Sequence, residues 1–271
     1  MHIVDGRAIA AGMEASVRRR VGDSRIHVVT LLMEGSRESA LYARLKEQAC
    51  RRVGITTETQ VLPGDAGTQD FLRELDELNG DDDVHGVMVQ LPLPGVDHRR
   101  LVEHIDPAKD VEGVHPCNLG ATQLGDERLA PCTPRAVLRI LEHENISLQG
   151  ADVVVVNHSD IVGKPLADML LNRDATVSVC HVYTGDLAAY TTEADVVVTG
   201  AGVRGLITGS MVKQGAAVVD VAIVSDEDGV HGDVEMTSMR GKAAMVTPVP
   251  GGVGPVTIAC ILENAVAAYK D

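Results

Sequence analysis

Aromatic side chains are scarce in this sequence of 271 residues, which has no tryptophan, one phenylalanine and four tyrosines. The 45% of residues that are hydrophobic are therefore almost all aliphatic, and such a composition is typical of buried parallel strands. The sequence also lacks an excess of basic residues. Its formal net charge of -15 argues against nonspecific nucleic-acid binding, and it offers no basic run to an anionic membrane.

Paired cysteines and long apolar runs are missing as well. The five cysteines are scattered, odd in number and without a C-x-x-C pair, which argues against a zinc site and against a disulfide framework. His115 lies close to Cys117, but no other ligand group has suitable spacing, so we expect no metal site. No run approaches the roughly 18 apolar residues that span a bilayer. The N-terminus has no basic region followed by a long apolar stretch, and we expect a soluble, cytoplasmic protein without a membrane partner.

Short valine-rich runs alternate with stretches of helical spacing along the chain. At about 150 residues per domain, the length favours two domains or one large α/β domain. In the first half the pattern predicts strands at 26–35, 57–62 and 84–92, with helices at 36–53 and 71–79. In the second half it predicts strands at 151–157, 175–181, 194–200, 216–223 and 243–250, with helices at 134–144 and 166–172. This succession predicts parallel sheets covered by helices, doubly wound in the second half.

The residues that follow two strands of the second half are candidates for a nucleotide site. The stretch NHSDIVGKP after Val156 keeps only the last glycine of a dinucleotide fingerprint, Gly163, although Asn157 can adopt the left-handed turn. Val182 and Tyr183 follow the next strand, and they match neither an NAD nor an NADP site. His158 is the nearest candidate cation for a phosphate. These residues alone leave open a βα turn without a ligand.

Two loops rich in proline and glycine interrupt the periodic pattern. They are VQLPLPG at 89–95 and VTPVPGGVGP at 246–255. Rigid prolines beside permissive glycines can form a shaped wall where the backbone approaches a flat ligand. Each loop taken singly is equally compatible with a simple turn.

Seven stretches of the chain match motifs of one known family, and the match is specific because their order and spacing agree as well. They are YARLK (42–46), VQLPLP (89–94), PAKDVEGVHP (107–116), PCTP (131–134), HSDIVGKP (158–165), ATVSVCH (175–181) and TPVPGGVGPVT (247–257). With these stretches the chain resembles the bifunctional methylenetetrahydrofolate dehydrogenase/methenyltetrahydrofolate cyclohydrolase family over nearly its full length.

The resemblance implies an α/β fold of two domains. Residues 1–121 are expected to form a folate-binding N-terminal domain on which the C-terminal helix 255–271 packs, and residues 122–254 a Rossmann-type, doubly wound NAD(P)-binding domain, with the active cleft between them. It implies NADP-dependent oxidation of 5,10-methylenetetrahydrofolate to the methenyl form, then hydrolysis to 10-formyltetrahydrofolate. It also implies a cytoplasmic homodimer of one-carbon metabolism that serves purine and amino-acid biosynthesis.

The resemblance assigns catalysis to Lys46, with Tyr42 stacked on the folate ring and Gln90 orienting the amine. Tyr42 and Lys46 are one helical turn apart and share a face. Because the methenyl intermediate is cationic, it disfavours the charged form of a nearby lysine, which can then accept a proton from attacking water. On residue type alone, a solvated surface lysine is the favoured interpretation of Lys46, because lysines on helices are ordinarily solvated. The other implied substrate-binding residues are Val89, Leu91, Pro250, Gly251, Gly252, Val253, Gly254 and Pro255, and the implied cofactor-binding residues are Asn157, His158, Ser159, Ile161, Gly163, Val182 and Ile223.

Two departures from the family pattern affect the expected site. The motif KDVDG, whose second aspartate binds the aminopyrimidine edge of the pterin, reads KDVEG here, so that Glu112 moves the carboxylate by one methylene. We expect activity with altered folate affinity. The usual GRS turn is Asn157-His158-Ser159, and Val182 and Tyr183 replace the expected hydroxyl and basic residues. We therefore expect a weakened 2′-phosphate site, with NADP used at reduced discrimination and NAD as the alternative.

Two more substitutions adjoin the same nucleotide pocket, Ala222 in place of a glycine and Val224 in place of an asparagine. Three functions are compatible with these departures. They are the two-activity enzyme, a relative that keeps only the dehydrogenase or only the cyclohydrolase, and a non-catalytic folate- or nucleotide-binding regulator. The combination of Lys46, Tyr42 and Gln90 argues against the regulator, because a pure binder has no need for an amine at the one-carbon centre.

Overall fold

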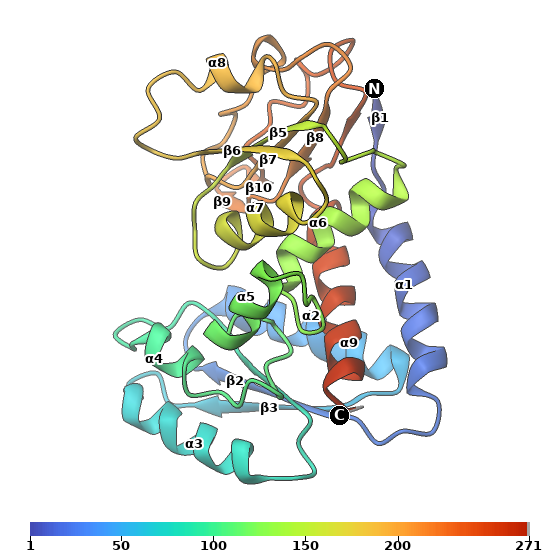
Figure 1. Ribbon diagram of the computed structural model, residues 1–271. Coiled ribbons are helices and arrows are strands. Elements are labelled where there is room, and N and C mark those ends of the chain that lie inside the picture. Colours follow the sequence, from blue (N-terminus) through green and yellow to red (C-terminus); the bar gives the residue numbers. More distant parts are fainter. Residues whose placement is uncertain (270–271) are drawn as a thin grey trace. The chain divides into compact units, whose positions relative to one another are not determined.

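The computed structural model describes residues 1–269, which divide into two compact units, each with its own parallel sheet (Figure 1). Unit 1 comprises residues 1–10, 122–125 and 131–257, and unit 2 comprises residues 11–121, 126–130 and the chain from 258 onward. Helices α1 (Gly6–Val21) and α9 (Val253–Tyr269) contribute residues to both units. The last two residues of the helix expected at 255–271 lie outside the described residues.

Unit 2 contains a three-stranded parallel sheet of order β3-β2-β4. Its elements are β2 (His27–Met33), α2 (Arg37–Val53), β3 (Thr56–Leu62), α3 (Thr68–Gly80), β4 (Gly86–Val89), α4 (His98–Val102) and most of α5 (Pro116–Gln123). The strands are parallel because a helix carries the chain back between β2 and β3 and again between β3 and β4. Strand β4 is shorter than the expected 84–92, and Pro92, which has no N–H for the ladder, lies beyond its end.

The core of unit 2 lies between this sheet and α3, which runs beside α4 (Figure 1). Alternate residues of β2, Val29, Leu31 and Met33, belong to this core, as the two-residue period of a strand requires. The single phenylalanine, Phe71, is fully buried there. The core is otherwise aliphatic, as the composition indicates.

Unit 1 contains a six-stranded parallel sheet of order β1-β11-β8-β7-β5-β6. Its elements are β1 (His2–Ile3), α6 (Cys132–His143), β5 (Asp152–Val156), α7 (Gly163–Leu171), β6 (Thr176–Cys180), α8 (Ala188–Thr191), β7 (Val196–Thr199), η1 (Gly209–Met211), β8 (Ala217–Asp220), β9 (Val224–Asp226), β10 (Gly229–His231) and β11 (Met245–Val246). From β5 the chain forms β6 on one side and β7 on the other. The strand order therefore reverses at β5, and ligands of open α/β sheets bind at such a point.

The first ten residues belong to unit 1, whereas the boundary drawn from the sequence places them in the N-terminal domain. Strand β1 pairs with β11 through His2 N, which donates to Ala244 O at 2.7 Å, and Val4 N, which donates to Val246 O at 3.0 Å. A two-residue strand leaves no periodic pattern, so the sequence gives no signal for it. It forms because β11 would otherwise leave its backbone groups unpaired at the sheet edge.

Helix α9 is apolar on nearly all sides, and its burial accounts for that composition. Asn264 is fully buried, and its Nδ2 donates to Val111 O and to Ala130 O, each at 3.0 Å. The C-terminal part of α9 thus fixes two loops of unit 2. Among residues 1–269, no helix combines the length and the apolar character that crossing a membrane requires.

Two buried aspartates fix the loops that follow β7 and β8 in unit 1. Asp233 accepts hydrogen bonds from Thr199 Oγ1 at 2.6 Å, Ala201 N at 2.6 Å and Val203 N at 2.7 Å. Asp220, 2% exposed, accepts from Ala222 N at 3.0 Å and Val234 N at 2.8 Å. Burial raises the pKa of Asp220 to about 6, and the negative charge of Asp233 acts in the same direction.

The raised pKa of Asp220 predicts a specific pH dependence of stability. Between pH 4 and pH 6 the native protein holds a proton on Asp220 that the unfolded chain releases, so this contribution to the free energy of unfolding is present below pH 4 and lost as the pH rises through 6. Relative to Asp220→Asn, the wild-type free energy of unfolding should fall across this window, by about 1.4 kcal/mol per unit of pKa shift.

Urea denaturation of both proteins at pH 4, 5, 6 and 7 measures this difference. The substitution Asp82→Asn at an exposed turn is the control, and it should follow the wild-type curve. Parallel curves for wild type and Asp220→Asn would contradict the prediction.

Candidate functional site

Helix α2 places Tyr42 and Lys46 on one face of unit 2. The helix begins at Ser36, whose Oγ accepts a hydrogen bond from Ser39 N at 3.1 Å, and ends at Gly54, whose φ of 88° suits glycine. Tyr42 and Lys46 are both half-buried and lie beside the buried Ala43. Burial raises the pKa of Tyr42, and the negative charge of Glu38 adds to the effect. Lys46 is therefore not a solvated surface lysine.

The amine of Lys46 is paired with Glu112. Its Nζ lies 2.7 Å from Glu112 Oε1, and the two side chains are 11% and 26% exposed. A partly buried, charge-assisted pair of this kind is stronger and better oriented than an exposed ion pair. The structure thus brings together the lysine of YARLK and the glutamate that departs from the family motif.

A buried aspartate fixes the loop that carries Glu112. Asp110 is 1% exposed, and its carboxylate accepts from Gly113 N at 2.9 Å, His115 N at 2.8 Å and Asn118 Nδ2 at 2.8 Å. Desolvation raises the pKa of Asp110, although the hydrogen bonds from Asn118 and His115 oppose the shift. Gly113 has a φ of 73°, and a Cβ there would lie 2.4 Å from the backbone of Ala130. The loop can follow this path only with glycine at that position.

The expected hydrogen bond between Gln90 and Lys46 is not formed in this structure, so the role of Gln90 stays a prediction. Gln90 Nε2 donates to Leu91 O at 2.9 Å, while Gln90 Oε1 is buried without a hydrogen-bond partner. Lys46 Nζ instead pairs with Glu112 Oε1, and a charged acceptor is preferred over a neutral amide. Val89 is buried at the end of β4 and Leu91 is half-buried after it, so packing of both side chains fixes the backbone around Gln90.

His98, on α4, is a neighbour of Glu112 that residue patterns did not indicate. Burial lowers the pKa of His98, while the negative charge of Glu112 opposes the shift. The imidazole therefore lies within electrostatic range of Glu112. A single histidine forms no motif with other residues of the sequence, so only the tertiary structure identifies it.

The loop 250–255 belongs to unit 1 and packs backbone against backbone. The Val249-Pro250 bond is cis, and Gly251 has a φ of 104°. A Cβ on Gly252 would lie 2.6 Å from Pro248 O, and one on Gly6 would lie 1.8 Å from Gly252 O. Val253 is buried at the start of α9 and Pro255 is half-buried, whereas Pro250 and Gly254 are exposed. Close packing thus explains Gly6 and Gly252, and the positive φ explains Gly251. The exposed residues are the ones a ligand can contact.

The turn after β5 is closed by a side chain. Asn157 does not have the left-handed conformation expected of it, since among the described residues only Asn145 and Asp174 combine a side chain with positive φ. Instead Asn157 Oδ1 accepts from Ser159 N at 2.7 Å and from Gly163 N at 3.1 Å. A Cβ on Gly163 would lie 2.1 Å from Asn157 O, so glycine is needed there for close approach. The side-chain amide replaces the tight glycine turn of the usual fingerprint.

Exposed aliphatic side chains surround the carboxyl edge of the sheet in unit 1. One follows each of four neighbouring strands: Ile161 after β5, Val182 after β6, Val203 after β7 and Ile223 after β8. They are 41%, 83%, 51% and 50% exposed, respectively. Exposed apolar side chains after these strands are available to a ligand at the carboxyl edge, where ligands of doubly wound sheets bind.

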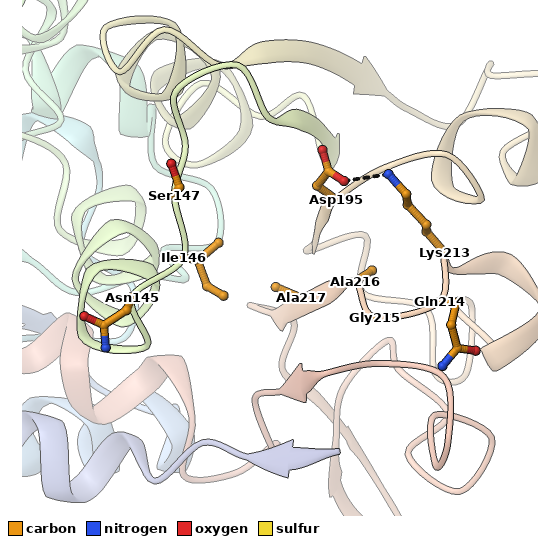
Figure 2. Close-up of a pocket in the computed structure, with 9 residues that line it drawn as sticks. All are labelled: Asn145, Ile146, Ser147, Asp195, Lys213, Gln214, Gly215, Ala216 and Ala217. Carbon is orange, nitrogen blue, oxygen red and sulfur yellow. Dashed lines mark hydrogen bonds and ion pairs between the residues drawn. The ribbon is translucent and has the colours of Figure 1, made fainter.

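A pocket of about 250 Å³ lies at the opposite edge of the same sheet (Figure 2). It is lined by residues that precede β7 and β8 or follow α6, and Figure 2 shows Asp195 and Lys213 directed toward each other. Their Oδ1 and Nζ are 2.6 Å apart, so the charges neutralise each other. No predicted site residue lines this pocket, and ligands of such sheets bind at the carboxyl edge. We do not regard it as the functional site.

Models of two domains of one family match most of the chain. The catalytic-domain model of tetrahydrofolate dehydrogenase/cyclohydrolase matches residues 4–112, and the NAD(P)-binding-domain model of the same family matches residues 131–271. A bifunctional protein FolD from Methanosarcina mazei is 46% identical over 271 residues, covering 97% of this chain and 94% of that protein.

Solved structures give the same result. The chain is similar to the bifunctional enzyme FolD, methylenetetrahydrofolate dehydrogenase/cyclohydrolase, from Campylobacter jejuni, with a TM-score of 0.96 and 40% identity over 100% of this chain and 99% of that one. It is also similar to the Trypanosoma brucei methylenetetrahydrofolate dehydrogenase-cyclohydrolase complexed with NADP and an inhibitor, with a TM-score of 0.93 and 34% identity over 99% and 97% of the two chains. The two-domain α/β fold expected from the sequence is confirmed, and the chain belongs to the tetrahydrofolate dehydrogenase/cyclohydrolase family.

Proposed function

We propose that this protein oxidises 5,10-methylenetetrahydrofolate to 5,10-methenyltetrahydrofolate with NADP, and then hydrolyses the methenyl cation to 10-formyltetrahydrofolate. The observation that carries the proposal is the partly buried pair between Lys46 Nζ and Glu112 Oε1 at 2.7 Å, one helical turn from Tyr42. Family membership adds support, because relatives that cover nearly the whole chain are named as bifunctional.

Lys46 handles the proton of the hydrolytic step in this proposal. Water adds to the methenyl carbon and loses one proton. Its second proton passes to N5 as the bond from that carbon to N5 breaks, which leaves the formyl group on N10. Lys46 accepts the proton once the substrate cation disfavours its ammonium form. Gln90 Oε1, a buried acceptor without a partner, is available to orient the amine when Glu112 turns to the substrate.

Glu112 and Tyr42 bind the pterin in this proposal. Two carboxylate oxygens match the adjacent N–H donors of an aminopyrimidine, and the half-buried ring of Tyr42 provides a stacking surface. Because Glu112 is held by Lys46, folate and lysine compete for the same carboxylate. Val89 and Leu91 of unit 2 are proposed to contact the folate, and the residues from Pro250 to Pro255 of unit 1 remain candidate substrate contacts.

NADP, when bound, accepts the hydride that leaves the methylene carbon. The residues of unit 1 fit a dinucleotide, because Ile161, Val182 and Ile223 are exposed at the carboxyl edge beside the turn of Asn157, Ser159 and Gly163. No guanidinium follows β5 or β6 in this chain. We therefore propose NADP use with reduced discrimination against NAD.

The proposal includes the biological setting that the family resemblance implies. In this proposal unit 2 carries Lys46, Tyr42 and Glu112 of the folate site, and unit 1 carries the nucleotide site. The protein is proposed to act as a cytoplasmic homodimer that supplies one-carbon units to purine and amino-acid biosynthesis.

The first test is the substitution Lys46→Met. Removing a group that transfers a proton costs about a hundredfold or more in rate, so we expect this loss in kcat of methenyltetrahydrofolate hydrolysis, followed by its absorbance. Lys242→Met, which replaces an exposed lysine of unit 1, should leave the rate unchanged. Equal rates for Lys46→Met and wild type would refute the proposed chemistry.

The second test is Glu112→Asp. The shorter side chain withdraws the carboxylate from Lys46 and restores the reach that the family motif has, so KM for methylenetetrahydrofolate should fall severalfold, since displacements on the order of 1 Å change such parameters about tenfold or more. Glu47→Asp makes the same change at a residue of α2 paired with Arg51, and it should have no effect. Unchanged KM and kcat in Glu112→Asp would remove this residue from the site.

The third test compares the two nucleotides. Each missing charge-assisted bond to the 2′-phosphate costs about 1.5–3 kcal/mol, so the ratio of kcat/KM for NADP over NAD should stay below about a thousand. Methenyltetrahydrofolate formation with each nucleotide gives the ratio. A value well above this limit would contradict the reduced discrimination.

A further inference from the structure

We propose that His158 and His181 together form the subsite for the 2′-phosphate of the nucleotide, and that Tyr183 provides the stacking surface for its adenine. This inference rests on the proposed nucleotide use and assigns the specificity for NADP to residues of this chain. It concerns unit 1 alone.

The two histidines meet where adjacent strands end. Val156 ends β5 and pairs in register with Cys180, the last residue of β6. His158 follows the first strand and His181 follows the second, and their ring centroids are 5.0 Å apart at 51°. In doubly wound sheets, the end of the second strand is where the 2′ position of an adenosine ribose is recognised.

The ring of His181 is held with one nitrogen available to a ligand. His181 N donates to Thr184 Oγ1 at 2.9 Å and Thr184 N donates to His181 O at 2.8 Å, which closes a tight turn. Tyr183 N donates to His181 Nδ1 at 3.2 Å. Because Nδ1 is the acceptor of this bond, Nε2 carries the hydrogen and remains a donor on an exposed residue.

The charges around the pair favour a phosphate over a ribose hydroxyl. No acid occupies the three positions after β6, where an NAD site has the carboxylate that binds the ribose diol. Asp186, the first acid beyond them, accepts from Ala189 N at 3.3 Å at the start of α8. Asp160, on the turn after β5, pairs with Lys164 at 2.5 Å. The subsite therefore offers two imidazole N–H donors, and no carboxylate stands where an NAD site binds the ribose diol.

Tyr183 completes the subsite with an uncovered aromatic ring. Its side chain is 86% exposed, and its ring stands edge-on to His181 at a centroid distance of 6.1 Å. An exposed aromatic ring beside a phosphate subsite is a stacking surface for a purine. An imidazole offers one or two N–H donors against the five of a guanidinium, so this subsite retains a preference for NADP that is weaker than an arginine would give.

Calorimetric titration of the full-length protein with 2′,5′-ADP and with 5′-AMP tests the assignment, because the two probes differ only in the 2′-phosphate. Wild type should bind 2′,5′-ADP more tightly. His158→Phe keeps the ring contact but removes the N–H, and His181→Asn keeps an acceptor for Tyr183 N but removes the Nε2 donor. Each should weaken 2′,5′-ADP binding roughly tenfold to a hundredfold and change 5′-AMP binding by less than about twofold.

Two further variants separate the subsite from general effects. Tyr183→Ala should weaken both probes equally, and His158→Arg should tighten 2′,5′-ADP alone. If the histidine variants weaken both probes alike, or neither, or if wild type does not distinguish the probes, the assignment is overturned. Methenyltetrahydrofolate formation by wild type is measured in parallel, because a protein inactive with both nucleotides disproves the proposed function whatever the binding data show.

Discussion

The ion pair between Lys46 and Glu112 is the interaction on which the candidate folate site depends. It joins residues 66 positions apart in the sequence, and both side chains are largely removed from solvent. In the free protein the Lys46 amine donates a hydrogen bond to Glu112, so the Glu112 carboxylate already has a partner. In the proposed function, folate competes with the lysine for this carboxylate, so that folate binding and the release of the amine are coupled.

That pair requires a rigid loop, and the loop is fixed by a buried carboxylate. Asp110 binds two backbone N–H groups and Asn118, while Gly113 passes too close to Ala130 for any side chain. Unit 1 uses the same device, since Asp233 and Asp220 bind backbone N–H groups of the loops that follow β7 and β8. In both units buried acids order the loops, and exposed residues are left for ligands.

The nucleotide half shows how a fold keeps its path when fingerprint residues are replaced. The amide of Asn157 bridges Ser159 and Gly163, so the turn after β5 closes without its first glycine. The arginine expected there is His158, which lies against His181 and adds a second imidazole to the same edge. The backbone path is retained, while an imidazole stands where the family pattern has a guanidinium.

The sequence by itself determined the fold class and the family, because aliphatic runs of period two and helical stretches of period 3.6 are local signals. The helical spacing was also enough to place Tyr42 and Lys46 on one face. Strand β1 escaped prediction because two residues show no period, and the turn at Asn157 was misjudged because its side chain replaces backbone geometry. Only the tertiary structure decided which group pairs with Lys46 and that Gln90 Oε1 has no partner. It alone also placed His98 near Glu112 and His158 against His181. These contacts depend on the paths of separate loops, and no local pattern records where two distant side chains meet.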